Sequence, residues 1–379
     1  ANTDDFNVTA ASSFNLNGGA ANDTFDIDAA LTGAIDGEAG SDTLDLSAAA
    51  TTNATLSASD GDGFAGTSVT NVSAGFDGIN TLTGGAAGTL TGLDTANTWA
   101  LDGTPTYNDG SNTLGFSGFA TLQGGANTDD FNVTAASSFN LNGGAANDTF
   151  DIDAALTGAV DGEAGTDTLQ GDNIDGVLIT TLDVNGADGT EASVSGNFSN
   201  FQTLTGNAGT LKGLDAVSVW DLDGSPTYTS GGFAVNFSGF ATLQGHSDKD
   251  TYNVTVASSF DLNGGSRNDT FIIDAVLTGF INGQGWGDTL RGDLIDAVTI
   301  TGDESGSGFP GIEDSITGGF GNIDHVIGNL GTFTGHDVAA TWDLDGTPNK
   351  YYHDDRSDPT DDLSVSSFAT FQGGTNTDA

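Results

Sequence analysis

Residues 2–44 read NTDDFNVTAASSFNLNGGAANDTFDIDAALTGAIDGEAGSDTL, and this stretch occurs two more times in the chain. Residues 127–169 repeat it with only two substitutions, and residues 249–290 carry a looser third copy. Within each copy the apolar residues recur every 19 residues; in the first copy they are Phe6, Phe25 and Leu44. A fixed internal period of this length indicates a stacked repeat architecture.

The order of apolar and polar residues predicts short β-strands joined by tight turns. Phe6-Asn7-Val8 and Phe25-Asp26-Ile27 alternate apolar with polar side chains, which is typical of a strand with one buried face. Between them lie glycine-rich segments such as Asn17-Gly18-Gly19. These segments predict turns, because glycine adopts positive φ freely. No segment shows a sustained helical period.

The 19-residue period predicts an all-β fold, a parallel β-solenoid of the β-helix or β-roll type with coils of about 19 residues. Each coil would lay its strand on the previous one at about 4.8 Å, so that Phe6 stacks on Phe25 and Leu16 on Ile35. A string of immunoglobulin-like sandwiches is the alternative fold. The fixed period disfavours it, since sandwich strands have no constant stacking interval.

Three long repeats follow one another, and we expect them to form one continuous rod. Repeat one covers residues 1–125, repeat two 126–246, and repeat three 247–379 together with the start of a fourth copy. No Pro-rich or Ser-rich linker separates them. The second half of each repeat keeps the period less cleanly, and we expect protruding loops at Asp60–Gly66 and Tyr351–Asp362.

The composition limits the partners. The chain has 53 acidic and six basic residues and a net charge of -47, which disfavours nucleic acid and anionic membranes and favours cations. It has no cysteine, so it has no disulfide framework. No apolar run approaches the ~18 residues of a membrane span, so we expect no membrane insertion in this segment. The chain has no methionine and begins within a motif, as a piece of a longer protein would.

An aspartate precedes each regular strand in a glycine-rich turn, as in Gly18-Gly19-Ala20-Ala21-Asn22-Asp23-Thr24-Phe25. This turn resembles the nonapeptide G-G-x-G-x-D-x-(apolar)-x of the repeats-in-toxin, or haemolysin-type, calcium-binding β-roll. In that family the aspartate and backbone carbonyls of stacked turns hold calcium between coils, and hard cations prefer such oxygen ligands. The resemblance implies Ca2+ as a cofactor and metal ligands at Asp4, Asp23, Asp42, Asp129, Asp148, Asp167, Asp250, Asp269, Asp288 and Asp378.

The turns depart from that family pattern. The second glycine is replaced by Glu38, Glu163 or Gln284, and the fourth-position glycine survives only as Gly40 and Gly165. Only one half of each coil carries the motif. A second interpretation therefore stays open, in which Asp and Asn close tight turns through hydrogen bonds from their side chains to the backbone.

The whole repeat resembles the repeat regions of very large secreted or surface-attached bacterial proteins, described as filamentous-haemagglutinin-like or calcium-binding adhesins. The resemblance covers nearly the whole chain. It implies a structural or adhesive role, as stalk, filament or adhesin, and an extracellular or cell-surface location. Its implied partners are divalent cations, glycans, and the surface of a host or neighbouring cell. Open coil ends would also allow end-to-end self-assembly.

We expect no enzymatic activity, and hence no catalytic residues. An active site is a singular constellation, whereas the aspartates recur with the period. Parallel β-helices do include polysaccharide lyases and hydrolases, and two carboxylates suffice for glycoside hydrolysis. The first 211 residues contain no Lys, Arg or His, which leaves a lyase no cationic group there. The alternative is a polysaccharide-binding or polysaccharide-degrading β-helix with its site in the third repeat.

The third repeat differs from the first two in its basic and aromatic residues. They include His246, Lys249, Arg267, Trp286, Arg291, His325, His336, Lys350, His353 and Arg356. Either they form a binding patch, for instance for a glycan, or they reflect divergence with local ion pairs. A tryptophan also recurs once per repeat, as Trp99, Trp220 and Trp342, and we interpret these three as core or coil-edge packing.

Overall fold

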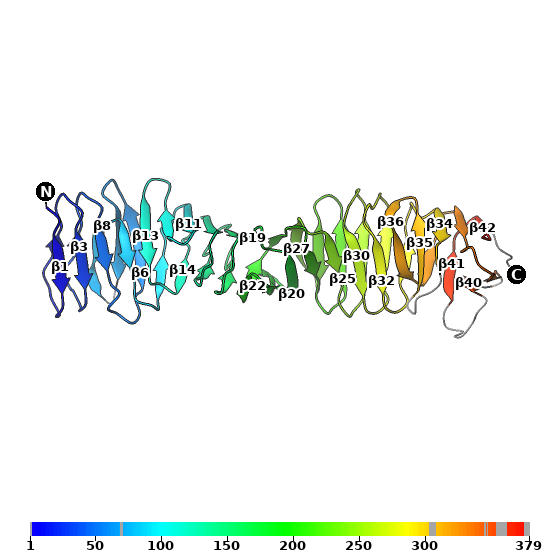
Figure 1. Cartoon of the computed structure of the whole chain (residues 1–379), viewed down its shortest axis with the longest axis horizontal. Coiled ribbons are helices and arrows are strands. Elements are labelled where there is room, and N and C mark those ends of the chain that lie inside the picture. The colour runs from blue at the N-terminus through cyan, green and yellow to red at the C-terminus, as the bar shows by residue number, and fades with distance from the viewer. Residues whose placement is uncertain are drawn as a thin grey trace. The chain divides into compact units, whose positions relative to one another are not determined.

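A computed structural model describes residues 2–68, 71–302, 308–344, 346, 348–353 and 362–374. This described part is all-β and has no helix. Its strands form two long sheets of 21 strands each, in which parallel pairing dominates (Figure 1). The prediction of a parallel β-solenoid is confirmed. No described segment forms a helix long and apolar enough to span a membrane.

We name the sheet that contains β1 sheet A and the other sheet B. Sheet A consists of β1 (Asp5–Val8), β3 (Thr24–Ile27), β5 (Thr43–Asp45), β9 (Thr81–Thr83), β11 (Asn97–Leu101), β12 (Thr106–Asn108), β13 (Thr113–Ser117), β15 (Asp129–Val133), β17 (Thr149–Ile152), β19 (Thr168–Gln170), β23 (Thr203–Thr205), β25 (Ser218–Leu222), β26 (Thr227–Ser230), β27 (Phe233–Ser238), β29 (Asp250–Val254), β31 (Thr270–Ile273), β33 (Thr289–Arg291), β37 (His325–Ile327), β39 (Ala340–Asp343), β40 (Asn349–His353) and β41 (Leu363–Ser366). Sheet B consists of β2 (Leu16–Asn17), β4 (Ile35–Asp36), β6 (Ala54–Ser59), β7 (Phe64–Ser68), β8 (Val72–Ile79), β10 (Thr89–Thr91), β14 (Thr121–Gln123), β16 (Asn140–Asn142), β18 (Val160–Asp161), β20 (Gly176–Asp183), β21 (Gly186–Glu191), β22 (Val194–Phe201), β24 (Thr210–Lys212), β28 (Thr242–Gln244), β30 (Asp261–Gly265), β32 (Ile281–Gln284), β34 (Ala297–Ile300), β35 (Phe309–Glu313), β36 (Ile316–Ile323), β38 (Thr332–Thr334) and β42 (Thr370–Gln372).

The regular coils have the register that the 19-residue period predicts. Phe6 pairs with Phe25 and Phe25 with Leu44 in sheet A, while Leu16 pairs with Ile35 in sheet B. The rings of Phe6 and Phe25 stack with their centroids 5.0 Å apart. Like side chains therefore form inward ladders, one rung per coil.

The coil length is not 19 residues throughout, because three-stranded antiparallel meanders interrupt the parallel stack. In sheet A, β12 pairs antiparallel with both β11 and β13; β13 then pairs parallel with β9, and β11 parallel with β15. In sheet B, β6–β7–β8 is built in the same way. The loop predicted at Asp60–Gly66 is shorter than expected, since β7 begins at Phe64, whose side chain is buried.

Each repeat has one three-strand run in sheet B and one in sheet A. The runs are β6–β8 and β34–β36 in sheet B, and β11–β13, β25–β27 and β39–β41 in sheet A, and β20, β21 and β22 occupy the matching place in the sequence of the second repeat. A run in one sheet alone would add two strands there with no counterpart in the other. With one run in each, every repeat adds seven strands to either sheet, one third of 21. The two sheets therefore gain the same number of strands in every repeat.

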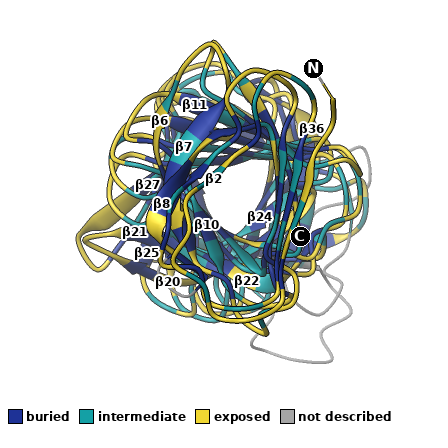
Figure 2. Cartoon of the chain, turned by 90° about the vertical axis from the view of Figure 1, so that its left-hand side faces the viewer, coloured by how far each residue is buried: buried dark blue, intermediate teal, exposed yellow. Residues whose placement is uncertain are grey.

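The chain divides into two compact units, and the division does not follow the predicted repeats. The first unit is residues 1–174 and 188–205, and the second is residues 175–187 and 206–379. In each, apolar side chains fill the interior of the coils. Figure 2 shows that the exposed residues lie mostly on the outer faces and loops. The continuous rod stays a prediction. The loop predicted at Tyr351–Asp362 lies mostly outside the described residues, as does Asp378.

Candidate functional site: the aspartate ladder

The residues predicted as metal ligands lie at one corner of the coil, each just before or at the start of a sheet A strand. Asp4 is exposed. The other eight have relative exposures of 0–1%, although aspartate is rarely buried without a partner. They are Asp23, Asp42, Asp129, Asp148, Asp167, Asp250, Asp269 and Asp288.

Each buried aspartate joins its own coil to a neighbouring coil. The backbone N–H of Asp129 donates to Oδ1 of Asp148 at 2.8 Å, and the N–H of Asp148 donates to Oδ1 of Asp167 at 2.8 Å. The same bonds link Asp4, Asp23 and Asp42 in the first repeat, and Asp250, Asp269 and Asp288 in the third. We call these three columns the aspartate ladder.

The far end of each column is a residue that the 19-residue period does not identify. The N–H of Asp42 donates to Oδ1 of Asn80 at 2.8 Å, 38 residues away. Gln202 accepts from Asp167 and Asp324 from Asp288 in the same way. A sequence signal does exist, because Asn80-Thr81-Leu82 repeats the polar-Thr-Leu pattern of Asp42-Thr43-Leu44 across the intervening meander.

The near end of two columns is closed by a tryptophan of the preceding repeat. Trp99 Nε1 donates to Oδ1 of Asp129 at 3.3 Å, and Trp220 Nε1 donates to Oδ1 of Asp250 at 3.2 Å. Both side chains are fully buried, and Trp99 stacks on Phe131 with the ring planes 5° apart. The interpretation of these two tryptophans as packing residues is confirmed.

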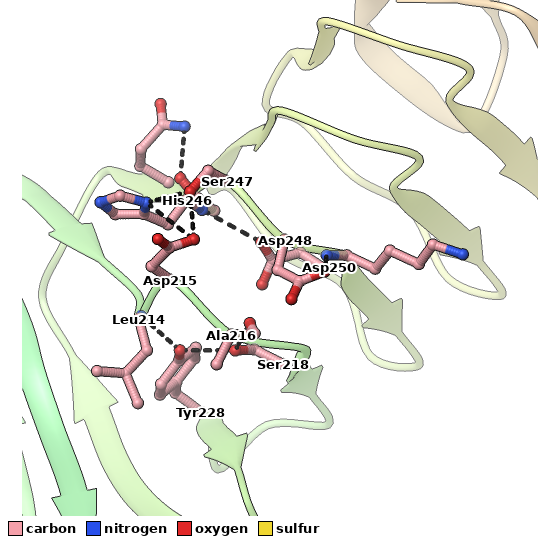
Figure 3. A network of polar contacts seen from close by, with 12 residues as sticks. Leu214, Asp215, Ala216, Ser218, Tyr228, His246, Ser247, Asp248 and Asp250 are labelled. Carbon is pink, nitrogen blue, oxygen red and sulfur yellow. Dashed lines mark hydrogen bonds and ion pairs between the residues drawn. The ribbon is translucent and has the colours of Figure 1, made fainter.

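A tyrosine fastens each sheet A meander to the adjacent corner. Tyr107 Oη accepts the N–H of Leu93 at 2.7 Å, and Tyr351 Oη accepts the N–H of His336 at 2.8 Å. Tyr228 Oη accepts the N–H of Leu214 at 2.6 Å (Figure 3). Burial raises the pKa of the Tyr107 and Tyr228 hydroxyls above the usual tyrosine value. These tyrosines therefore act as hydrogen-bonding packing residues.

The second carboxylate oxygen of the ladder residues is buried against a glycine. Oδ2 has no hydrogen-bond partner in Asp23, Asp42, Asp148, Asp167, Asp269 or Asp288. A Cβ on Gly143 would lie 2.4 Å from Oδ2 of Asp148, so only glycine leaves room for the carboxylate there. The first glycine of the motif is thus required by the aspartate five residues later.

Burial dominates the electrostatics of the ladder. Loss of solvation raises the pKa of Asp148, Asp250 and Asp269 to about 7 and that of Asp288 to about 9. The pKa of Asp129 and of Asp167 is raised to about 6 by the same cause. Neighbouring aspartates raise several of these values further, while the backbone N–H donors lower them. Near neutral pH the ladder therefore binds protons that an exposed aspartate would have released.

Calcium does not fit the ladder carboxylates as they are arranged. Ca2+ takes six to eight oxygen ligands at about 2.3–2.6 Å. Here Oδ1 already accepts a backbone N–H, and Oδ2 of Asp148 is enclosed against Gly143. Within the described ranges no group of three or more His, Cys, Asp or Glu side chains is arranged to hold a metal ion. Calcium binding by this chain stays a prediction.

Asparagines tie coils together at other positions of the same turns. Asn22 Oδ1 accepts the N–H of Ser41, and Asn147 Oδ1 accepts the N–H of Thr166, both at 3.0 Å. Asn15 Oδ1 likewise accepts the N–H of Ala34 at 3.0 Å. Side-chain-to-backbone hydrogen bonding, the second interpretation of the turns, is thus present in the structure, but it joins neighbouring coils as well as residues within one turn.

One cluster in the second unit brings together Asp215, His246 and Ser247 (Figure 3). His246 Nδ1 lies 3.1 Å from Ser247 Oγ and 3.7 Å from Asp215 Oδ1, and Ser247 Oγ donates to Asp215. A nucleophilic triad needs the serine and the carboxylate at opposite nitrogens of the imidazole. Here both contact Nδ1, so the cluster lacks the geometry of a proton relay.

A shallow groove in the second unit lies between the turn that follows β25 and the turn that follows β29. Its volume is about 410 Å3, and its lining includes Leu222, Pro226, Val256 and Phe260. It contains none of the predicted site residues.

The fold and the ladder together define the class of this protein as a parallel β-solenoid repeat protein. A scan against protein-family models finds no match for the chain, and no curated protein matches it.

Proposed function

We propose that the chain is a structural segment of a long repetitive protein, in which stacked coils act as a stalk or filament that spaces other parts apart. It is not an enzyme. The supporting observation is the aspartate ladder, because the most regularly recurring polar residues of the sequence form bonds between coils. A catalytic group would have to be free to meet a substrate.

The remaining parts of this proposal rest on composition and on the resemblance of the repeats. The protein acts outside the cell or at its surface, where it carries or forms an adhesive structure. A net charge of -47 suits a medium rich in salt and divalent cations, which screen repulsion along the coils. End-to-end assembly through open coil ends belongs to the same proposal.

Deleting one whole repeat tests the spacer role. Asp129 and Asp250 occupy the same ladder position, so removal of residues 127–247 leaves the stacking register intact. We expect the shortened chain to fold cooperatively. Its maximum dimension in small-angle X-ray scattering should fall by about 34 Å, from seven strands at about 4.8 Å each.

The same two proteins serve in a test for catalysis. Both are incubated with a panel of acidic and neutral polysaccharides, and new reducing ends are measured. Neither protein should release any. An unchanged maximum dimension after the deletion, or turnover of any polysaccharide by the full chain, would overturn the proposal.

A further inference from the structure

One corner of the second unit differs from the matching corners of the other repeats. Arg267 stands where the second repeat has Ala146, and Trp286 stands where it has Gly165. Both side chains are exposed, and Trp286 has a relative exposure of 70%. The third repeat thus places a cation and a large aromatic ring where the second has almost no side chain.

The register places these two residues side by side. Gly265 pairs with Gln284 on one side of them, and Thr270 with Thr289 on the other, each with an offset of 19 residues. Arg267 and Trp286 therefore occupy equivalent positions on adjacent coils, one strand spacing apart. They form one continuous surface.

The backbone at both residues is in the left-handed region, with φ of 70° for Arg267 and 81° for Trp286. This conformation is disfavoured for a bulky residue and is usually adopted by glycine. Trp286 also exposes its ring, with no aromatic or cationic partner among the described residues. The fold thus carries an unfavourable backbone at Trp286 while most of the side chain stays exposed to solvent, which is a pattern of binding sites.

Two polar side chains lie close to the backbone of Gly287, the residue that follows Trp286. A Cβ on Gly287 would lie 3.2 Å from Nδ2 of Asn268 and 3.3 Å from Nε2 of His325. In the other repeats the asparagine at this position is occupied, since Asn147 accepts the N–H of Thr166. The structure gives Asn268 no such bond, so its amide faces Gly287 unengaged.

The adjoining outer face of sheet A changes character in the same repeat. Arg291 pairs with Ile272 and Ile327, and all three project to the outside of the sheet. The matching row in the first repeat contains Asp26 and Asp45. An acidic row is thus replaced by a basic and apolar one.

The arginines of this surface lack acidic partners. Neither Arg267 nor Arg291 forms a side-chain hydrogen bond or ion pair within the part of the chain that is described. The chain has 53 acidic residues and six basic ones, so a cation without a neighbouring carboxylate is unexpected. The register places Arg267 beside the exposed indole, and Arg291 lies further along the chain at the end of β33. Two guanidinium groups and an indole on one surface favour a ligand that has both negative charge and a flat apolar face.

We propose that Arg267, Asn268, Trp286, Arg291 and His325, here named the Arg267–Trp286 corner, form a binding site for an acidic saccharide built from uronate sugars. The indole stacks on the C–H face of one sugar ring. Arg267 and Arg291 pair with uronate carboxylates, and Asn268 and His325 hydrogen-bond to ring hydroxyls over Gly287. This site goes beyond the structural role and does not depend on it.

The test is titration of the full chain with a hexagalacturonate, followed by tryptophan fluorescence and calorimetry. Trp99 and Trp220 are fully buried and Trp342 is half-buried, so the part of the fluorescence change that Trp286→Gly abolishes reports Trp286. Trp286→Gly and Arg267→Ala restore the residues of the second repeat, and glycine relieves the positive φ at position 286, so neither variant should lower the urea midpoint. Each should weaken binding by about tenfold or more, and the double variant should show none.

Lys212→Ala is the matched control, because it removes one positive charge from sheet B of the same unit and should leave the affinity unchanged. Equal affinity for neutral maltohexaose, or an affinity of the double variant within about twofold of wild type, would overturn the proposal. So would sedimentation that shows the chain self-associating through this corner, since a second acidic copy would then be its partner.

Discussion

The backbone N–H of Asp129 donates a hydrogen bond to Oδ1 of Asp148, 2.8 Å away, and neither residue is more than 1% exposed. The two residues are 19 positions apart in the sequence and one coil apart in the fold. The aspartate of the sequence motif is therefore the residue that joins one coil to the next at the stacking interval. An amide that would otherwise be buried without a partner finds one on the next coil.

Two substitutions of Asp148 test the contributions of its hydrogen bond and of its charge separately. Asp148→Ala leaves the buried Asp129 N–H unpaired and should lower the free energy of unfolding by about 1–3 kcal/mol. Asp148→Asn keeps the Oδ1 acceptor and removes the buried charge, so at pH 8 it should be at least as stable as wild type. Urea unfolding measures both. Asp130→Ala, an exposed neighbour, should change stability by no more than about 0.5 kcal/mol. Equal losses from the alanine and asparagine variants would contradict the account.

Gly143 should tolerate no side chain. Its Cβ would lie 2.4 Å from Oδ2 of Asp148 and 2.7 Å from the carbonyl oxygen of Gly162, so Gly143→Ala should destabilise the fold by roughly 1–3 kcal/mol. At Gly61 an added Cβ meets nothing within 4 Å, and Gly61→Ala is the control. Comparable unfolding midpoints for the two variants would show that the carboxylate is not enclosed as described.

Stability should rise as the pH falls from 8 to 5. The pKa of Asp148, Asp250 and Asp269 is raised to about 7 in the folded chain, against about 3.9 when unfolded. The folded state therefore binds more protons across this range, and its extra stability is complete below about pH 4 and lost as the pH rises through 7. Urea midpoints at constant high ionic strength test this. Asp148→Asn with Asp269→Asn should flatten the dependence, and a midpoint that rises toward pH 8 would contradict it.

At the ladder, calcium should stabilise the chain only as a salt does. The oxygens of the buried ladder aspartates either accept backbone or tryptophan N–H groups or are enclosed against glycine, so screening of the acidic surface is the remaining effect. Thermal unfolding in calcium chloride, and in chelator with sodium chloride of equal ionic strength, should give the same midpoint. A gain specific to calcium that Asp148→Asn removes would instead restore the ladder as a metal site.

The sequence was sufficient for the regular coils because apolar residues recur at the stacking interval and so define the register. Phe6, Phe25 and Leu44 recur at the stacking interval and stack as predicted. It was insufficient for the meanders. Alternation of apolar and polar residues marks a strand but not its direction, and in Trp99–Pro105 only the turn pair Asp102-Gly103 indicates that the chain reverses after β11.

The burial of the aspartates also could not be predicted from the residues next to them in the sequence. Asp148 looks like an ordinary turn residue, and only the stacking of a second coil encloses it. The 19-residue period does not identify Asn80 for a related reason, because the meander β6–β8 lengthens its coil and places it 38 residues from Asp42. The sequence shows Trp286 as an extra tryptophan of the third repeat, but its position beside Arg267 follows only from the register of β30 with β32 and of β31 with β33.

Hydrogen exchange at the amide of Asp129 tests the ladder most directly. In the wild-type chain this amide should be among the slowest to exchange, because its acceptor is the buried Oδ1 of Asp148. In Asp148→Ala it should exchange much faster, while the amide of Asp250, in the other unit, stays protected by Asp269. Fast exchange at Asp129 in the wild type, or protection that Asp148→Ala leaves unchanged, would contradict the claim that the aspartates join the coils.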